Sequence, residues 1–135
     1  MISFTLGEIA GITGGRYSGP KELLDRRIQD ATIDSRTVQS GCLFVPIVGE
    51  RFDGHDFIPQ AMDKGAIAVL AENEKSYDCP VIYVDSTIKA LLAMAKAYRA
   101  IFDIPVVGIT GSTGKTTTKE LVANVLSQKF DTLKN

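Results

Sequence analysis

The sequence predicts an α/β protein in which short apolar strands alternate with helices in an open sheet. Three runs, "CLFVPIVG" (42–49), "AIAVLA" (66–71) and "PVIYVD" (80–85), have the length and β-branched content of buried strands. A fourth run, "IPVVGIT" (104–110), is apolar on both faces, which is typical of a central parallel strand. The chain has 135 residues, 44% of them hydrophobic, so it has about the size of one domain and enough apolar side chains for a core.

The first half of the chain predicts one helix, several strands and a second helix. Thr5 and Glu8 have capping-box spacing before a short helix that the glycines at 14–15 end. The segment 26–36 then alternates as a strand should, and "CLFVPIVG" follows it, although its proline weakens that prediction. The glycine-punctuated stretch 49–57 predicts a loop, and the next helix ends near Gly65.

The second half predicts a long helix, a strand, a glycine-rich turn and another helix. Asp85 or Ser86 can cap the helix at 87–102. We expect its buried face to consist of Ile88, Leu91, Leu92, Ala95 and Tyr98. The strand 104–110 and a helix over 115–128 follow, and the last five residues, "DTLKN", are expected to begin a further strand. The boundary between two domains is expected near residue 85.

Composition narrows the class of protein. The 15 basic and 16 acidic residues give a formal charge of −1 and are mixed along the chain, which argues against a nucleic-acid or membrane-surface partner. Cys42 and Cys79 form no CxxC pair, and we expect free thiols. The first residues lack the basic start of a secretory leader, and no apolar run approaches the roughly 18 residues of a membrane span. We expect a cytoplasmic protein.

The turn between the last strand and helix has the features of a phosphate-binding loop. The stretch "GSTG" (111–114) leads into a helix whose first N–H groups lack internal partners, and Lys115 adds a full positive charge. The Thr116 hydroxyl is placed to coordinate Mg²⁺. The strict pattern GxxxxGK[ST] fails at one position, because Ile109 stands where glycine is required. The alternative is an ordinary helix N-terminus with a solvated lysine.

A second polar cluster follows two of the predicted strands. "DSR" (34–36) and the loop 49–57 come after neighbouring strands, where ligands of open α/β sheets bind. Arg36 and Arg51 are able to grip a diphosphate, Ser35 to hydrogen-bond a base or phosphate, and Phe52 to stack on a ring. The alternative is an ordinary capped turn.

The single histidine, His55, lies in this same loop. We interpret it as a hydrogen-bonding residue of a turn rather than as a catalyst. No metal-ligand spacing surrounds it, so a zinc site is not expected.

The motifs together resemble one family. "GITGSTGKTTTKE" resembles the ATP loop of the Mur ligases, a family whose pattern accepts isoleucine at position 109. "DSR", "GCLFVPIVGERFDGHDFI" and "AMDKGAIAVLAE" are similar to the first domain of the same enzymes. The resemblance is to the member that joins D-alanyl-D-alanine to UDP-N-acetylmuramoyl-tripeptide in peptidoglycan synthesis. The alternative is the sister ligase that adds the third amino acid.

This resemblance implies two domains that bind different ligands. Residues 1–84 would form an α/β domain that binds the UDP-sugar peptide, and residues 85–135 would begin the ATP-binding domain of the P-loop type. The residues implied to hold ATP are Gly111, Ser112, Thr113, Gly114, Lys115, Thr116 and Thr117. Among them, Lys115 would steady the transferred phosphoryl group and Thr116 would bind Mg²⁺. The residues implied to meet the uridine diphosphate are Ser35, Arg36, Gly49, Glu50, Arg51 and Phe52.

The resemblance also implies what this chain lacks. In the family, the ATP domain continues with a metal-binding glutamate, a modified lysine and more strands beyond the helix at 115–128. We therefore expect no ligase turnover from these residues alone. Two other functions stay open, a stand-alone UDP-sugar module with a vestigial phosphate loop and an unrelated P-loop NTPase. We also expect self-association or fraying at the strand 106–110, because it lacks neighbours to pair with.

Overall fold

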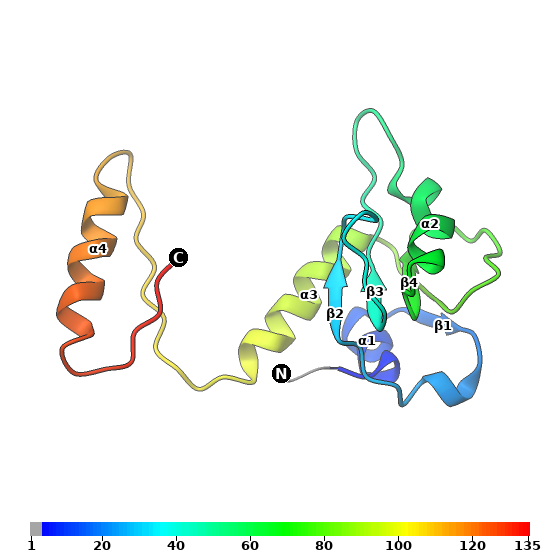
Figure 1. The fold of residues 1–135 in the computed structure, drawn as a ribbon, viewed down its shortest axis with the longest axis horizontal. Helices are drawn as coiled ribbons and strands as arrows, with labels where there is room; N and C mark the ends of the chain where they lie inside the picture. The colour runs from blue at the N-terminus through cyan, green and yellow to red at the C-terminus, as the bar shows by residue number, and fades with distance from the viewer. Residues whose placement is uncertain (1–3) are drawn as a thin grey trace. The chain divides into compact units, whose positions relative to one another are not determined.

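The chain folds into two compact units. The computed structural model describes residues 4–135 and divides them into unit 1, which ends at Phe102, and unit 2, Asp103–Asn135 (Figure 1). Each unit is described by itself below.

Unit 1 is built on a five-stranded sheet with the order β1-β5-β4-β3-β2. Its strands are β1 (Arg16–Ser18), β2 (Asp30–Thr32), β3 (Cys42–Phe44), β4 (Ala68–Ala71) and β5 (Val81–Tyr83). The four strands from β2 to β5 are parallel, and β1 pairs with β5 in the antiparallel direction. The predicted strands of this half are confirmed, whereas β1 was not predicted.

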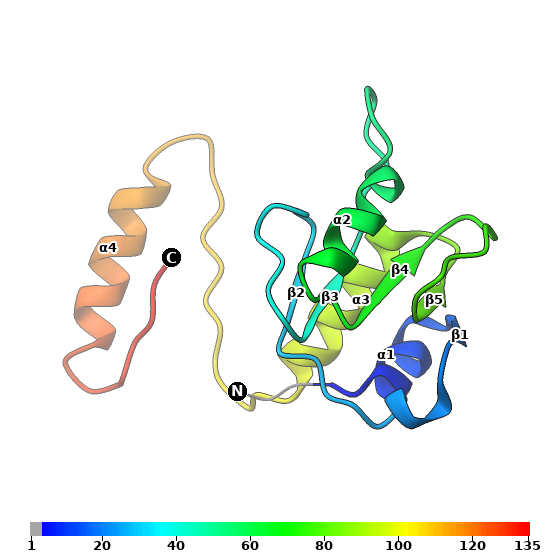
Figure 2. The ribbon, with the colours of Figure 1, turned by 45° about the vertical axis from the view of Figure 1, so that its right-hand side comes forward.

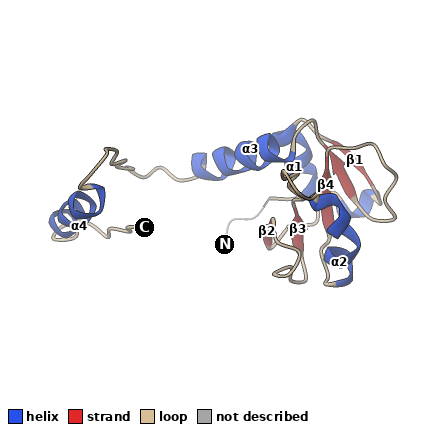
Figure 3. Ribbon diagram, turned by 90° about the horizontal axis from the view of Figure 1, so that it is seen from above, coloured by secondary structure: helices blue, strands red, loops and turns tan. Residues whose placement is uncertain are grey.

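Helices cover both faces of this sheet. They are α1 (Leu6–Thr13), η1 (Lys21–Leu23), η2 (Gly54–Phe57), α2 (Ile58–Asp63) and α3 (Thr87–Ala100). Figure 3 shows α1 and α3 on one side of the strands and α2 on the other. The η2 turn, a single 3₁₀ turn, forms inside the stretch that the sequence predicted as a loop. Unit 1 is therefore a three-layer α/β/α arrangement, which confirms the α/β prediction.

The core has two halves because strand side chains alternate between faces. Leu43 in β3 and Val45 directly after it belong to the half that includes α1 and α3, and Phe44 in β3 belongs to the half that includes α2. In β4, Leu70 belongs to the first half and Val69 to the second. All five side chains are buried. Since both faces are covered, the strands read as continuous apolar runs, which is why they were recognisable in the sequence.

The helix α1 begins and ends as its sequence predicts. The Thr5 N–H donates to Glu8 Oε2 at 2.7 Å, and the Glu8 N–H donates to Thr5 Oγ1 at 3.1 Å, so the capping box is complete. Gly14 ends the helix with φ of 64°, in the left-handed region that glycine adopts without strain. Leu6 and Ile9 are then buried against the sheet.

The helix α3 corrects two predictions. Ser86 caps it as expected, but its buried residues are Thr87, Ala90 and Met94. Of the predicted face, Leu91 packs partly against the core, whereas Ile88, Leu92, Ala95 and Tyr98 are exposed. The small Ala90 lies in the core that α3 shares with α1, where close packing of the two helices decides which face is buried. Because α3 packs with unit 1, the chain divides after this helix and not near residue 85.

Unit 2 contains one helix, α4 (Lys115–Leu126), at the predicted position. No strand forms within residues 103–135, so the strands expected at 104–110 and 131–135 are absent from this structure. The physical reason is that a strand requires a partner to accept and donate its backbone hydrogen bonds, and the described residues of unit 2 offer none. Ala123 is the only buried residue of this unit.

Two further features concern the whole described chain. Both cysteines are free, Cys42 buried in β3 and Cys79 half-buried before β5, as the sequence predicted. Within residues 4–135 there is no helix whose length and apolar content would let it cross a lipid bilayer.

Candidate functional site

The predicted phosphate loop is an exposed turn that leads directly into α4. Gly114 is the N-cap of the helix. Its φ of 73° is a left-handed backbone conformation that residues other than glycine rarely adopt. The Gly114 carbonyl accepts the first helical hydrogen bond from the Thr118 N–H at 2.9 Å. The Lys115 ammonium donates to the Gly111 carbonyl oxygen at 2.5 Å, so the lysine side chain lies along its own loop.

This loop has the donor groups that a phosphate requires. The N-cap glycine has no side chain to accept from the first turn of α4, and no side-chain cap bond is formed there. The N–H groups of that turn are therefore open to an anion, at the end of the helix where the dipole is positive. Residues 111–118 are all exposed, and Thr116 and Thr117 place hydroxyl groups on the same turn. The residues present thus fit a nucleotide phosphate and one oxygen ligand to its metal ion.

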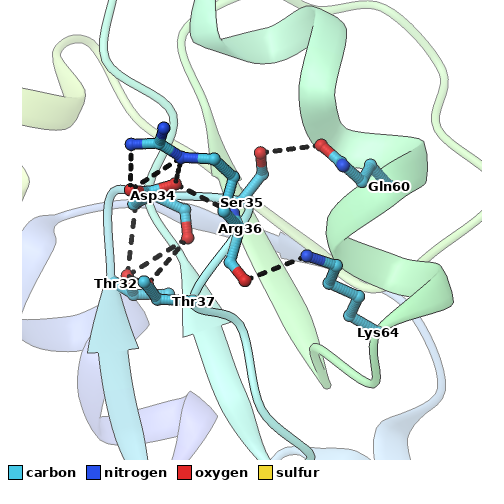
Figure 4. A network of polar contacts seen from close by, with 7 residues as sticks. All are labelled: Thr32, Asp34, Ser35, Arg36, Thr37, Gln60 and Lys64. Carbon is cyan, nitrogen blue, oxygen red and sulfur yellow. Dashed lines mark hydrogen bonds and ion pairs between the residues drawn. The ribbon is translucent and has the colours of Figure 1, made fainter.

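The "DSR" turn follows β2 and is held by the Asp34 carboxylate (Figure 4). The Arg36 guanidinium donates to both carboxylate oxygens of Asp34, from Nε at 2.9 Å to Oδ1 and from Nη2 at 2.8 Å to Oδ2. The Arg36 N–H also donates to Asp34 Oδ1 at 2.9 Å. Hydrogen bonds from Arg36 hold the pKa of Asp34 at about 2, below the 3.8 of an unperturbed aspartate. The Asp34 carboxylate therefore stays ionised at neutral pH and pairs with the exposed Arg36 guanidinium.

Gln60 of α2 and Lys64, the residue that follows α2 as its C-cap, complete this network. Ser35 is buried, and its hydroxyl donates to Gln60 Oε1 at 2.8 Å. The Lys64 ammonium donates to the Arg36 carbonyl oxygen at 2.9 Å, as Figure 4 shows. The Ser35 hydroxyl thus ties the turn to α2, and a ligand would meet its remaining lone pair rather than its proton. Gln60 and Lys64 were not predicted as part of this cluster, because their bonds to the turn join residues that are distant in sequence.

The loop that follows β3 is a tight hairpin. Val48 pairs with Asp53 in an antiparallel bridge, and the Gly49 N–H donates to the Phe52 carbonyl oxygen at 3.0 Å. Glu50 and Arg51 lie between them and are exposed. Phe52 is 66% exposed. Figure 2 shows this loop extending outward beyond the end of β3.

The two loops share one edge of the sheet. They follow β2 and β3, which are parallel neighbours, so Ser35 and Arg36 come to the same sheet edge as Gly49, Glu50, Arg51 and Phe52. This is the position of ligands in open α/β sheets. The six predicted substrate residues therefore lie on two adjacent loops of unit 1. Residues 111–117 lie in unit 2.

His55 has structural partners on both ring nitrogens. Its Nδ1 lies 2.5 Å from Asp53 Oδ1, and its Nε2 accepts the Glu72 N–H at 3.0 Å. These contacts agree with the interpretation of His55 as a hydrogen-bonding residue of a turn. Among residues 4–135, no group of three or more histidine, cysteine, aspartate or glutamate side chains is placed to hold a metal ion.

Comparison with curated proteins gives relatives with two related activities. The UDP-N-acetylmuramoyl-tripeptide–D-alanyl-D-alanine ligase of Synechocystis sp. is 47% identical over 107 residues, which cover 77% of this chain and 24% of that enzyme. The Escherichia coli enzyme of the same name is 41% identical over 133 residues, covering 98% of this chain and 28% of the relative. A UDP-N-acetylmuramoyl-L-alanyl-D-glutamate–2,6-diaminopimelate ligase of Aquifex aeolicus is 43% identical over 106 residues, 75% of this chain and 21% of that enzyme. The chain thus spans about a quarter of the length of these relatives.

Solved structures similar to this chain are also ligases of this kind. The D-alanyl-D-alanyl ligase of Acinetobacter baumannii superposes with a TM-score of 0.82 at 29% identity, over 96% of this chain and 29% of its own. The MurF ligase of Thermotoga maritima, solved in complex with ADP, has a TM-score of 0.67 at 41% identity, over 74% of this chain and 23% of its own.

The family profile described as "Mur ligase family, catalytic domain" matches residues 27–108. This match includes β2 to β5, the two loops that follow β2 and β3, and α3, and it ends before residues 111–117. Since it covers more than half of the sequence, and since the relatives above extend it to nearly the whole chain, this protein belongs to the Mur ligase family.

Proposed function

We propose that these 135 residues are the N-terminal part of an ATP-dependent ligase that joins D-alanyl-D-alanine to UDP-N-acetylmuramoyl-tripeptide. The observation that carries the proposal is the 41% identity to an enzyme of that name over 98% of the chain, which includes both the substrate loops and the phosphate loop. The activity is proposed for a protein as long as these relatives, of which this chain spans about a quarter.

The proposal assigns substrate binding to unit 1. Arg36 and Arg51 would contact the diphosphate, because guanidinium groups match phosphate oxygens in pairs. Ser35 would accept a hydrogen bond through the lone pair that Gln60 leaves open. Phe52, exposed on its hairpin beside Gly49 and Glu50, would stack on the uracil ring. The supporting observation is that these residues share the edge of β2 and β3.

The proposal assigns ATP to unit 2. The N–H groups of residues 111–117 would hold the phosphates, and Lys115 would leave the Gly111 carbonyl to meet the transferred phosphoryl group. Thr116 would supply one of the six oxygen ligands that Mg²⁺ prefers. In the proposed reaction the γ-phosphoryl group moves to the terminal carboxylate of the tripeptide. The amine of D-alanyl-D-alanine then displaces phosphate to form the amide.

The activity is tested on a protein extended to the length of the relatives. We expect it to release phosphate from ATP only when UDP-N-acetylmuramoyl-tripeptide and D-alanyl-D-alanine are both supplied. Phosphate release that neither compound changes would overturn the ligase assignment. Turnover with 2,6-diaminopimelate and the dipeptide-bearing precursor instead would favour the sister ligase. That ligase is the second candidate because the Aquifex aeolicus relative has its name.

Binding is tested on the 135-residue chain by calorimetry with UDP-N-acetylmuramoyl-tripeptide. We expect Arg36→Ala to weaken binding about tenfold, as loss of a charged hydrogen-bonding partner does. Arg26→Ala removes the same charge from an exposed position outside the substrate loops and serves as the control. If the two variants bind equally, Arg36 is not part of the substrate site. Tight binding of ATP without any response to the UDP compound would argue against a UDP-sugar module.

Self-association is a separate proposal about unit 2. Val106 and Val107 are more than 60% exposed in a segment without a strand partner. A second copy of this chain could supply one by edge-to-edge pairing. Sedimentation of the chain at increasing concentration should reveal dimers. A chain that stays monomeric at millimolar concentration, with protected amides through residues 104–128, would contradict the proposal.

A further inference from the structure

His55 is the single histidine of the chain, and it is 5% exposed. It lies in η2, directly after the hairpin 48–53 that carries four of the proposed substrate residues. The proposed reaction leaves this side chain without a role. Its contacts therefore require a separate explanation.

The hydrogen-bond partners define the protonation state of the ring. The Glu72 N–H is a backbone donor, so the Nε2 that it contacts at 3.0 Å must be an acceptor. The ring proton then lies on Nδ1, where it faces Asp53 Oδ1 at 2.5 Å. The same Asp53 oxygen accepts the His55 N–H at 2.9 Å. The arrangement fits a neutral imidazole in the Nδ1–H form.

These contacts connect the hairpin to two other elements of unit 1. Asp53 closes the hairpin through its bridge with Val48. Glu72 directly follows β4, and its Oε1 accepts from the Thr87 N–H at 2.6 Å and from Thr87 Oγ1 at 2.7 Å at the start of α3. A continuous path of hydrogen bonds thus runs from the hairpin through His55 to the end of β4 and the first turn of α3.

Gly54, between Asp53 and His55, packs closely against the backbone of Ile47. A Cβ atom on Gly54 would lie 2.6 Å from the Ile47 nitrogen and 2.7 Å from the Ile47 oxygen. The Gly54 N–H donates to that oxygen at 3.0 Å. The base of the hairpin is therefore fixed on one side by close backbone packing and on the other by the imidazole, whereas its tip is exposed.

We propose that His55 is a positioning residue, which holds the hairpin 48–53 against the end of β4 so that Arg51 and Phe52 face the nucleotide part of the substrate. This inference rests on the proposed function for the choice of ligand. Its structural part, that the neutral ring fixes the hairpin through two hydrogen bonds, is independent of any ligand. His55 itself does not touch the reacting atoms.

The first test is the tautomer. A ¹⁵N-labelled 135-residue chain has one imidazole, so its two ring nitrogen signals are unambiguous in a long-range ¹H–¹⁵N spectrum. At neutral pH we expect the Nδ1–H form, although free histidine favours Nε2–H. A ring in the Nε2–H form would overturn the inference.

The second test separates the two hydrogen bonds. His55→Asn keeps a donor near the Nδ1 position for Asp53, His55→Gln keeps an acceptor that reaches the Glu72 N–H, and His55→Ala removes both. We expect the alanine variant to bind UDP-N-acetylmuramoyl-tripeptide about tenfold more weakly, with partial recovery in one or both of the other variants. Met94→Ala, which removes a buried side chain from α3, is the control for a loss of stability alone. It should leave the affinity unchanged.

Amide exchange keeps the inference separate from the proposed function. We expect the hairpin amides 48–53 to exchange faster in His55→Ala than in Met94→Ala, in the absence of any ligand. If the wild-type chain fails to bind the UDP compound, the ligand assignment fails, and the exchange rates still decide the role of His55. Equal hairpin exchange in the two variants, or wild-type affinity in His55→Ala, would show that His55 does not position the loop.

Discussion

Units 1 and 2 contain similar apolar sequences that have different structures. The run 42–44 in unit 1 forms β3 and is buried on both faces, whereas the run 106–109 in unit 2 forms no strand and is largely exposed. Both runs are apolar, Cys-Leu-Phe in the first and Val-Val-Gly-Ile in the second. The difference is that β3 lies between β2 and β4, while unit 2 has no strand at all among its described residues. Strand formation therefore depends on available partners as much as on the local sequence.

Hydrogen exchange should give the largest difference between the units. The amides of β3 and β4 open only when unit 1 unfolds, which costs about 5 kcal/mol or more in a stable domain. The amides of residues 106–110 are expected to exchange at nearly the rate of an unstructured peptide. The measurement is residue-resolved exchange by NMR in D₂O. Strong protection in 106–110 would mean that this segment finds a partner in solution.

Core substitutions should give the next largest effect. Phe44→Ala removes a buried ring between β3 and α2, and we expect it to lower the free energy of unfolding by about 3–5 kcal/mol. Val125→Ala in α4 removes a side chain that is 72% exposed, and we expect a change within about 0.5 kcal/mol. Urea unfolding followed by circular dichroism measures both. Similar losses in the two variants would reveal a core in unit 2.

Glycine substitutions should give a smaller contrast between the units. Gly54→Ala forces a methyl group against the Ile47 backbone, and we expect a cost of about 1–3 kcal/mol. At Gly108 a Cβ atom would meet nothing within 4 Å, so Gly108→Ala should leave stability almost unchanged. Thermal unfolding provides the comparison. Unchanged stability in Gly54→Ala would show that the Ile47 backbone at the base of the hairpin can shift to accept a methyl group.

The pH dependence of stability should give the smallest difference between the units. The folded-state pKa of Asp34, about 2, is below the value of 3.8 expected when unfolded, so its contribution is present above pH 4 and is lost as the pH falls toward 2. Asp34→Asn should make the stability of unit 1 less dependent on pH in that window. A hydrogen bond from Lys134 likewise lowers the pKa of Glu120 in α4. Glu120→Gln should leave the transition of unit 1 unchanged, and acid titrations monitored by circular dichroism test both.

Much of unit 1 was predictable because local signals agreed with the tertiary structure. Thr5 and Glu8 form the expected capping box, and the strands that are covered on both faces appear in the sequence as apolar runs. The strand β1 was missed because "RYS" is short and has no apolar alternation, so only its pairing with β5 identifies it. The buried face of α3 was missed because Thr87 is buried by its bonds to Glu72, which lies far from it in sequence.

The candidate site was predictable to a similar degree. The turn 34–36 and the loop 49–57 were recognised because polar residues follow apolar strands. The bonds from Gln60 and Lys64 to the first of these turns join residues that are distant in sequence, and no local pattern specifies them. The same is true of the bond between His55 and the Glu72 N–H. Sequence patterns thus indicated where the loops lie, and the fold determines how they are held.

The order of the strands has a consequence for aggregation. The segments most able to stack into fibrils, Cys42–Phe44 and Ala68–Ala71, lie inside the sheet with both backbone edges occupied. The outer strands are three residues long, and each carries a charged residue, Asp30 in β2 and Arg16 in β1. Short, charged borders of this kind offer little template for another molecule to extend. Folded unit 1 should therefore resist aggregation through strand pairing for as long as β3 and β4 keep their neighbouring strands.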